Sequence, residues 1–384
     1  MPVKLTHLRL VNWRNFKNVS LKLQDRMFIV GPNAAGKTNL LDAFRFLHDI
    51  ACPGGSLVGA VEKRRGVEHM RSLYARAQNT VSVEVSLLIA DDPTPWTYAL
   101  ELVAGDKKRA PVRVASEKVR YGDEAVLTRP DADDKKDGQR LTETHLEQTS
   151  QNARFRGIAE ALASVMHIHV VPQVAKGGSG TEGLAARDAA GSDFIEQLAL
   201  LSPKQQASRL KRIQALLKIA VPLFSELKVT RDTRGRPHLE AKYTHWRPRG
   251  GWQNEQEFSD GTLRLIGLFW AIENGTAPLI LEEPELSLHA DVVRQIPRLL
   301  SKAAAENGRQ FFVSTHSEEM LHDLGVEPDE VVLLRPTAEE TKAVLGSEVR
   351  EVRAATKAGV GLARAVRALT RPKGIEQMGL PGVA

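Results

Sequence analysis

The sequence predicts an α/β fold in which a mixed or parallel core sheet accompanies an antiparallel β subdomain and a helical lid insertion. A glycine-rich loop near residue 31 joins an apolar run to a helical pattern, and from about residue 224 onward the chain returns to strands and then alternates helix and strand. Such alternation is typical of a parallel sheet covered by helices. Two runs at 80–90 and 96–103 alternate apolar and polar residues, which predicts antiparallel strands.

The remaining elements follow from local pattern. Three short strands are expected within residues 3–31, and a helix after the glycine-rich loop should end near Cys52. Helical patterns also occur near 153–166, 192–201 and 203–220, and strands are expected at 278–282, 310–314 and 330–334. The charged stretch 129–140 has no apolar periodicity, which favours an exposed loop or disorder. We expect three parts: residues 1–103, an insertion at 104–223, and residues 224–384.

Composition limits the function classes. Cys52 is the only cysteine of 384 residues, so an internal disulfide and a cysteine-rich metal site are excluded. No apolar run approaches the roughly 20 residues that span a bilayer, and nothing resembles a signal peptide. We therefore expect a soluble, cytoplasmic protein without a membrane partner.

The positive charge is concentrated in one segment. The whole chain has a net charge of +6, whereas residues 204–249 contain twelve Lys and Arg against three acidic residues. Basic residues there alternate with Tyr243 and Trp246, and Trp252 follows. A DNA-binding surface is one interpretation, because cations and aromatic rings contact phosphates and bases. An ordinary solvated face is the other.

The glycine-rich loop matches G-x-x-x-x-G-K-[ST] from Gly31 to Thr38. It lies between a strand-like run and a helical pattern, which is the context such a loop requires. Glycines let backbone N–H groups surround an anion, and the helix N-terminus adds a positive dipole end. Lys37 would reach the β- and γ-phosphates and Thr38 would bind Mg²⁺, so the predicted ligands are ATP and Mg²⁺. The predicted nucleotide-binding residues here are Asn33, Ala34, Ala35, Gly36, Lys37, Thr38 and Asn39.

Two adjacent carboxylates, Glu282 and Glu283, end an apolar strand far downstream, and Pro284 follows them. A strand that simply reaches the surface would explain them equally well when they are taken alone. Adjacent residues of an extended chain point to opposite sides, so the two carboxylates should have separate tasks.

Several stretches together resemble the ABC-type ATPase heads of the RecF, SMC and OLD-like (AAA_21-type) group. "EFSDGTLRL" is similar to the signature motif of this group and contains Ser259 and Gly261, and "VSTHS" is similar to its switch loop and contains His316. "HVVPQ" is similar to the strand before the glutamine loop and contains Gln173, and "VNWRNF" is similar to the N-terminal motif and contains Arg14. Each stretch alone has an ordinary explanation, such as a helix cap, a strand-end histidine or a turn cation. His167 and His169 are interpreted as ordinary strand residues.

The resemblance implies roles for these residues. Glu282 would hold Mg²⁺ together with Thr38 and Gln173, Glu283 would polarise the attacking water, and Arg14 would approach the nucleotide. Lys37, Glu283 and His316 would form the catalytic set. Ser259 would complete the site of a second subunit, so the resemblance implies an ATP-dependent homodimer. Residues 285–288 resemble the loop that touches the partner subunit.

Three functions are compatible with this set. The leading interpretation is an ATP-driven switch for a separate effector protein or a DNA transaction, as in prokaryotic antiviral defence. We keep, as an alternative, a RecF-like DNA-repair clamp that binds duplex DNA through residues 204–249. A transporter subunit fits poorly because "FSDGT" departs from transporter signatures. The absence of heptads excludes a long coiled coil, and no nuclease motif occurs in the C-terminal tail.

Overall fold

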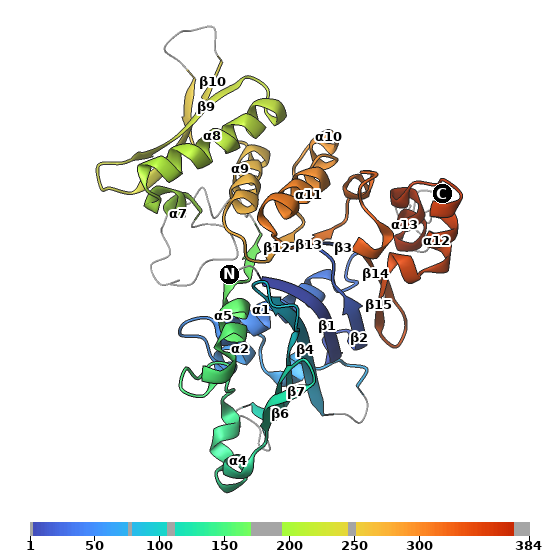
Figure 1. Cartoon of the computed structure of the whole chain (residues 1–384). Coiled ribbons are helices and arrows are strands. Elements are labelled where there is room, and N and C mark those ends of the chain that lie inside the picture. Colours follow the sequence, from blue (N-terminus) through green and yellow to red (C-terminus); the bar gives the residue numbers. More distant parts are fainter. Residues whose placement is uncertain (1–2, 76–78, 106–111, 170–193, 245–250, 372–384) are drawn as a thin grey trace, which may run out of the picture.

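The computed structural model describes residues 3–75, 79–105, 112–169, 194–244 and 251–371. An antiparallel sheet and a mostly parallel sheet form its core, with helices between and around them (Figure 1). The prediction of an α/β fold with both kinds of sheet is confirmed. Within the described residues, no helix is long and apolar enough to cross a membrane.

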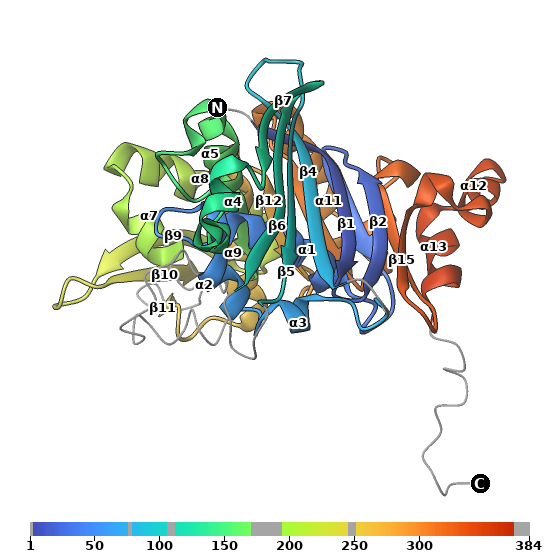
Figure 2. The same cartoon turned by 90° about the horizontal axis from the view of Figure 1, so that it is seen from below.

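The antiparallel sheet has the strand order β2-β1-β4-β5-β6-β7, and its strands lie side by side in Figure 2. Its members are β1 (Val3–Trp13), β2 (Phe16–Lys22), β4 (Thr80–Ile89), β5 (Trp96–Val103), β6 (Arg113–Tyr121) and β7 (Glu124–Arg129). Alternate residues of β4 are buried, from Val81 to Leu87, because one face of the sheet covers the core and the other meets solvent. The sheet continues past residue 103 through β6 and β7.

The second sheet has the order β15-β14-β3-β13-β12-β8. Its strands are β3 (Arg26–Val30), β8 (Met166–Ile168), β12 (Leu279–Glu282), β13 (Phe311–Thr315), β14 (Val331–Pro336) and β15 (Thr341–Leu345), and only β15 pairs antiparallel. All five residues of β3 are buried, as expected for a strand covered on both faces. The carboxyl ends of β3, β12 and β13 therefore meet at one edge.

Helix α1 (Lys37–Ala51) packs between the two sheets. It shares one core with the antiparallel sheet, α2 (Leu57–Glu62), α3 (Val67–Met70) and α5 (Arg156–Ser164). Ile280 and Phe312 join this core from the second sheet, whereas their neighbours Leu281 and Val313 face a second core. That second core contains α9 (Asp260–Glu273), α10 (Ala290–Val293) and α11 (Ile296–Asn307). The alternation of strand residues thus fixes which helices cover each face.

A separate lobe projects beyond α9 (Figure 1). It contains α7 (Phe194–Leu200), α8 (Pro203–Ala220) and the sheet β9 (Phe224–Arg231), β10 (Pro237–Tyr243) and β11 (Trp252–Asn254). Helix α8 begins with a capping box in which Ser202 accepts from Gln205 N, and Pro203 occupies the first turn as predicted. On the opposite side of the molecule lie α12 (Arg350–Lys357) and α13 (Leu362–Thr370). Their apolar residues, including Val352 and Val366, are buried in the second core, so the tail closes that core.

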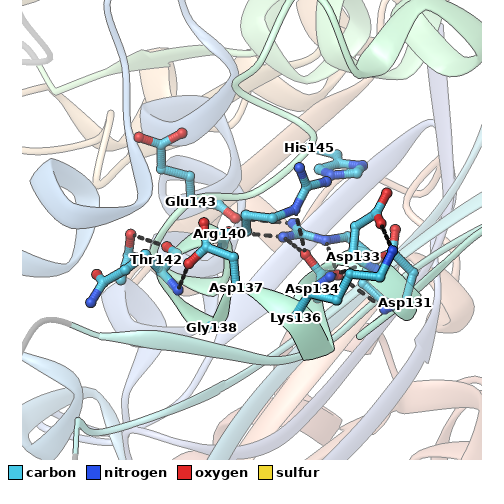
Figure 3. A network of polar contacts seen from close by, with 12 residues as sticks. Asp131, Asp133, Asp134, Lys136, Asp137, Gly138, Arg140, Thr142, Glu143 and His145 are labelled. Carbon is cyan, nitrogen blue, oxygen red and sulfur yellow. Dashed lines mark hydrogen bonds and ion pairs between the residues drawn. The ribbon is translucent and has the colours of Figure 1, made fainter.

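The stretch 129–140 is mostly exposed, as expected, but the expectation of a loop or disorder is wrong. This stretch forms α4 (Ala132–Lys136) and, with Leu141 and Thr142, the turn η1 (Gly138–Thr142), and Arg129 binds Glu117 and Asp134 through side chains that are fully buried. Figure 3 shows the surrounding polar network. The hydrogen bond from Arg129 holds the pKa of the Asp134 carboxyl far below its usual range. Two charges of this stretch, Arg129 and Asp134, are used in a buried ion network, whereas Asp133, Lys135, Lys136 and Asp137 stay exposed.

The remaining short elements connect these layers. They are η2 (Asn152–Phe155), η3 (Glu318–Leu321), η4 (Pro328–Glu330) and η5 (Gly346–Glu348).

Candidate functional site

The phosphate loop connects β3 to α1, as the sequence predicts. Helix α1 begins directly after Gly36, whose φ of 97° lies in the left-handed region that glycine tolerates. A Cβ atom at this position would lie only 2.3 Å from Asn15 Nδ2. In the described part of the chain no side chain caps the first turn of α1. The N-terminal N–H groups are therefore available to an anion.

Other predicted loop residues lie around this turn. Ala35 is fully buried, whereas Asn33, Ala34 and Thr38 are exposed. Ala34 has a positive φ of 60°. The loop therefore combines one anchored residue with several that face solvent.

Lys37 is almost fully buried, with 6% of its surface exposed. Its Nζ donates to Gly31 O at 3.0 Å and Pro32 O at 3.3 Å, and lies 3.2 Å from His316 Nδ1. Burial lowers the pKa of the Lys37 ammonium, while Glu283 and Glu285 oppose this effect. The ammonium group is thus held inside the loop with its hydrogen bonds aimed at backbone oxygens.

His316 connects Lys37 to Glu283. Its Nδ1 faces the Lys37 ammonium, and its Nε2 lies 3.0 Å from Glu283 Oε1. An ammonium group can only donate, so Nδ1 must accept and the proton of a neutral ring must sit on Nε2. The Nε2–H of the ring therefore lies on the side of Glu283. Glu283 itself has a positive φ of 46°, a conformation that is uncommon for a residue with a side chain and clusters at functional sites.

Glu282 points to the other side, toward Thr38. Thr38 Oγ1 donates to Glu282 Oε2 at 3.0 Å, and Arg45 Nη1 lies 3.9 Å from Oε1. Burial opposes ionisation of Glu282, but the hydrogen bonds from His167 and Thr38 and the nearby charges of His167 and Arg45 together keep the pKa of the carboxyl below its ordinary value. A hydroxyl and a carboxylate at a phosphate loop are the hard oxygen ligands that Mg²⁺ prefers, so these residues fit that ion.

His167 and His169, interpreted from the sequence as ordinary strand residues, both contact Glu282, and His167 lies in β8. His167 Nε2 lies 2.7 Å from Glu282 Oε1, and His169 Nδ1 lies 3.1 Å from the backbone oxygen of Glu282. Burial lowers the pKa of the His167 ring, although the bond to Glu282 opposes this. The available sequence signal was their spacing, two residues apart and directly before "VVPQ".

Glu285 holds the switch loop in place. Its Oε1 accepts from Thr315 Oγ1 at 2.7 Å and from His316 N at 2.8 Å. Glu285 belongs to the turn after β12, so this turn and the end of β13 are joined through one carboxylate. The position of His316 therefore depends on the conformation of residues 285–288.

Ser259 and Gly261 lie at the start of α9. Ser259 caps this helix by accepting from Thr262 N at 3.1 Å, which is the ordinary explanation of the motif. A Cβ at Gly261 would lie 2.7 Å from Ser287 O, so the helix start packs closely on residues 285–288. The exposed Ser259 lies at this packed corner.

Arg14 lies beside α1 and is held there. Its Nη2 donates to Asp42 Oδ2 and its Nη1 to His69 O, both at 3.1 Å. The neighbouring Asn15, which the sequence reasoning missed, binds the loop directly through Ala35 O at 2.8 Å and accepts from Asn39 at 2.8 Å. Its position in "VNWRNF" was the available signal.

Two further predictions fall partly or wholly outside the described residues. Gln173 lies outside them, as do residues 245–250 of the basic segment. In the described part of that segment, Lys228 pairs with Glu240 at 2.8 Å, and its Nζ lies 3.9 Å from the centre of the Trp252 ring. Cations and an aromatic ring do share one face of the β9–β11 sheet, but acidic residues neutralise part of the charge.

Comparisons with known proteins agree with this geometry. Residues 26–321 match the family AAA_21, described as "AAA domain, putative AbiEii toxin, Type IV TA system". Among curated proteins, none matches significantly. The fold is similar to an SmcHead bound to the C-winged helix domain of ScpA, with a TM-score of 0.53 and 13% identity over 90% of this chain and 98% of that one. It is also similar to an Smc head with an extended coiled coil, bound to the C-terminal domain of ScpA derived from Pyrococcus furiosus, with a TM-score of 0.52 and 12% identity over 93% and 99%.

Proposed function

The chain belongs to the AAA_21 family of P-loop ATPases and has the fold of an SMC-type ABC ATPase head, and from this premise we propose that it binds and hydrolyses ATP at the edge where β3, β12 and β13 end. One observation carries the proposal: Lys37, His316 and Glu283 lie in a continuous row of polar contacts across the phosphate loop, with 3.2 Å from Lys37 to His316 and 3.0 Å from His316 to Glu283. These three residues come from three distant parts of the sequence. An ordinary strand-end histidine would not require both partners.

Lys37, His316 and Glu283 each have a role in the proposed phosphoryl transfer. The N–H groups of Lys37 that now bind Gly31 O and Pro32 O would be offered to phosphate oxygens. Glu283 would accept a proton or hydrogen bond from the attacking water, and His316 would hold that carboxylate in place by donating from Nε2. Catalysis would then consist mainly of positioning and electrostatic stabilisation.

Thr38 and Glu282 would hold Mg²⁺ beside the phosphates. The bound ion would neutralise charge that develops on the transferring phosphoryl group. Arg14 would remain on α1 near the loop, and Asn15 would keep Gly36 in its left-handed conformation. The residues of the loop would bind the phosphates through their backbone N–H groups.

Phosphate release by the purified protein tests this proposal. The wild type should release phosphate from ATP in the presence of Mg²⁺. Lys37→Ala should weaken ATP binding and abolish release, whereas Glu283→Gln should bind ATP and lose turnover by about 10²- to 10⁴-fold. Lys17→Ala is a matched control, because Lys17 pairs with Glu339 at the surface and makes no contact with the described loop residues among the ion pairs and hydrogen bonds of its side chain. Unchanged turnover in Lys37→Ala would contradict the proposal.

We further propose that ATP drives formation of a homodimer in which Ser259 of one subunit completes the site of the other. The support is local: Ser259 is exposed at the start of α9, and this corner packs against residues 285–288, which in turn hold His316 through Glu285. Contact with a partner subunit at this corner would therefore affect the position of His316 beside Lys37 and Glu283. An ATP-bound Glu283→Gln protein should elute as a dimer from a sizing column and as a monomer without ATP.

We propose that this dimer is a switch for a separate effector protein, as in prokaryotic antiviral defence. The apolar faces of α12 and α13 are already buried in the second core. By contrast, Leu200, Ile219 and Leu223 expose 82%, 87% and 68% of their surfaces on the α7–α8 lobe. This lobe is therefore the better candidate for the partner contact. An effector that co-purifies with wild type from the native host and is lost with Ile219→Asp would support it.

The alternative, a clamp that binds duplex DNA directly, is favoured by the shared face of Lys228, Lys242 and Trp252. DNA binding by the isolated protein should then weaken steeply with salt. Lys228→Glu should reduce the affinity at any DNA sequence. Binding that is undetectable at low salt would remove this alternative.

A further inference from the structure

The carboxylate of Glu282 is held from two sides. Thr38 Oγ1 donates to Oε2, and the His167 ring contacts Oε1 at 2.7 Å. Both side chains are largely buried, with 10% of His167 and 13% of Glu282 exposed. We propose that His167 is a positioning residue that fixes the Glu282 carboxylate so that Oε2 faces Thr38 and Mg²⁺. This inference rests on the proposed ATPase function.

The direction of the hydrogen bond follows from the chemistry of the pair. An ionised carboxylate only accepts, so His167 Nε2 must carry the hydrogen. The other ring nitrogen, Nδ1, is buried and has no hydrogen-bond partner in the described part of the structure. A lone pair there is less costly than an unpaired N–H group. A neutral His167 therefore donates one hydrogen bond, and its target is Glu282.

Strand register explains why this histidine reaches that carboxylate. β8 pairs in parallel with β12, and His167 is aligned with Ile280. Residues 280 and 282 point to the same face of β12, so a ring that begins beside Ile280 can extend toward Glu282. His169, two residues further along the chain, contacts the backbone oxygen of Glu282. The end of β12 is thus held at both its side chain and its backbone by one neighbouring segment.

Glutamate has one more rotatable bond than aspartate, so the Glu282 side chain needs the contact with His167 to hold it in one orientation. A free glutamate at the end of β12 would sample several rotamers, only some of which reach Thr38. The contact with His167 selects one of them before Mg²⁺ binds. Residues that orient a metal ligand in this way usually change metal affinity about 10- to 100-fold when they are mutated.

The test separates positioning from simple stabilisation. His167→Phe keeps a ring and removes the donor, whereas His167→Gln restores a donor near the position of Nε2. Binding of Mn²⁺ in the presence of a non-hydrolysable ATP analogue is measured by electron paramagnetic resonance. We expect His167→Phe to weaken Mn²⁺ binding about 10- to 100-fold and His167→Gln to recover most of it. His7→Phe, in β1 of the antiparallel sheet, is the matched control and should bind Mn²⁺ like the wild type.

A double mutant tests the pairing itself. The side chain in Glu282→Asp is one methylene shorter, so its carboxylate no longer reaches the His167 ring. Adding His167→Phe to this variant should therefore change Mn²⁺ affinity less than about twofold. A purely structural contact would lower the melting temperature and leave Mn²⁺ affinity unchanged, and that result would overturn the inference. Failure of the proposed function is distinguishable. In that case Lys37→Ala would bind Mn²⁺ in the presence of the ATP analogue as tightly as the wild type does.

Discussion

Glu147 is predicted to make the protein less stable as the pH rises from about 5 to 7. Its Oε2 accepts from Leu57 N at 2.7 Å and from Thr144 Oγ1 at 3.0 Å, which ties the loop at 144–147 to the start of α2. Burial raises the pKa of this carboxyl from 4.5 to about 7. Between these values the folded protein binds more protons than the unfolded chain, so the free energy of unfolding falls with increasing pH.

The size of the effect follows from this shift. A difference of that size corresponds to about 3 kcal/mol, and solvent screening of the partly exposed carboxylate reduces it to about 1–2 kcal/mol. Glu147→Gln keeps both hydrogen bonds, because an amide oxygen accepts like a carboxylate oxygen, and it removes the ionisation. We therefore expect the variant to match the wild type at pH 5 and to be about 1–2 kcal/mol more stable at pH 8.

Urea unfolding at pH 5, 6, 7 and 8 measures this difference directly. Glu143→Gln is the control, since it removes one negative charge from an exposed position of the same segment without touching α2, and it should stay within about 0.5 kcal/mol of the wild type. A stability difference for Glu147→Gln that does not change with pH would refute the reasoning. So would a variant that is less stable than the wild type at pH 8.

Three further outcomes are expected. Ser259→Arg should bind ATP but neither dimerise nor hydrolyse it, and a mixture with Lys37→Ala should regain part of the activity, since mixed dimers contain one intact composite site; no regain would contradict the shared site. Arg129→Met should lower the free energy of unfolding by about 3–5 kcal/mol, because two buried carboxylates lose their partner; a loss below about 1 kcal/mol in urea would contradict this. Glu255 raises the pKa of His238 through their hydrogen bond, so this pair stabilises the lobe fully below about pH 6.5 and progressively less as the pH rises through that raised pKa. His238→Gln should remove this pH dependence from urea unfolding, and an unchanged profile would show that the pair contributes nothing.

Local pattern was sufficient for most of the elements. The apolar runs that became β3, β12 and β13 are continuous because these strands are covered on both faces, and the helix after Gly36 has a clear apolar face. The phosphate loop is recognisable because its chemistry depends on spacing within eight residues. The contact between Lys37 and His316 follows from parallel strands that end at one edge, which the order of the elements already implies.

Other features depend on contacts that no local pattern encodes. β8 has only three residues, so its register beside β12, and with it the contact of His167 with Glu282, could not be obtained from periodicity. The charges of Arg129 and Asp134 predicted solvent exposure, since nothing nearby in the sequence showed that Glu117 would meet them in the interior. Buried ion networks of this kind require knowledge of all partners at once.

The central position of β3 has a consequence for synthesis of the chain. Arg26 pairs with Phe311, and Phe28 pairs with Val331, so both neighbours of β3 are made long after it. At a synthesis rate of about 5–20 residues per second, β3 remains without these neighbours for roughly 15 to 60 s after it is made. The antiparallel sheet has all its strands by Arg129 and can form in that interval. The phosphate loop is therefore anchored only after β13 and β14 have been made, and a chain that stops before them exposes an unpaired apolar strand instead of a nucleotide site.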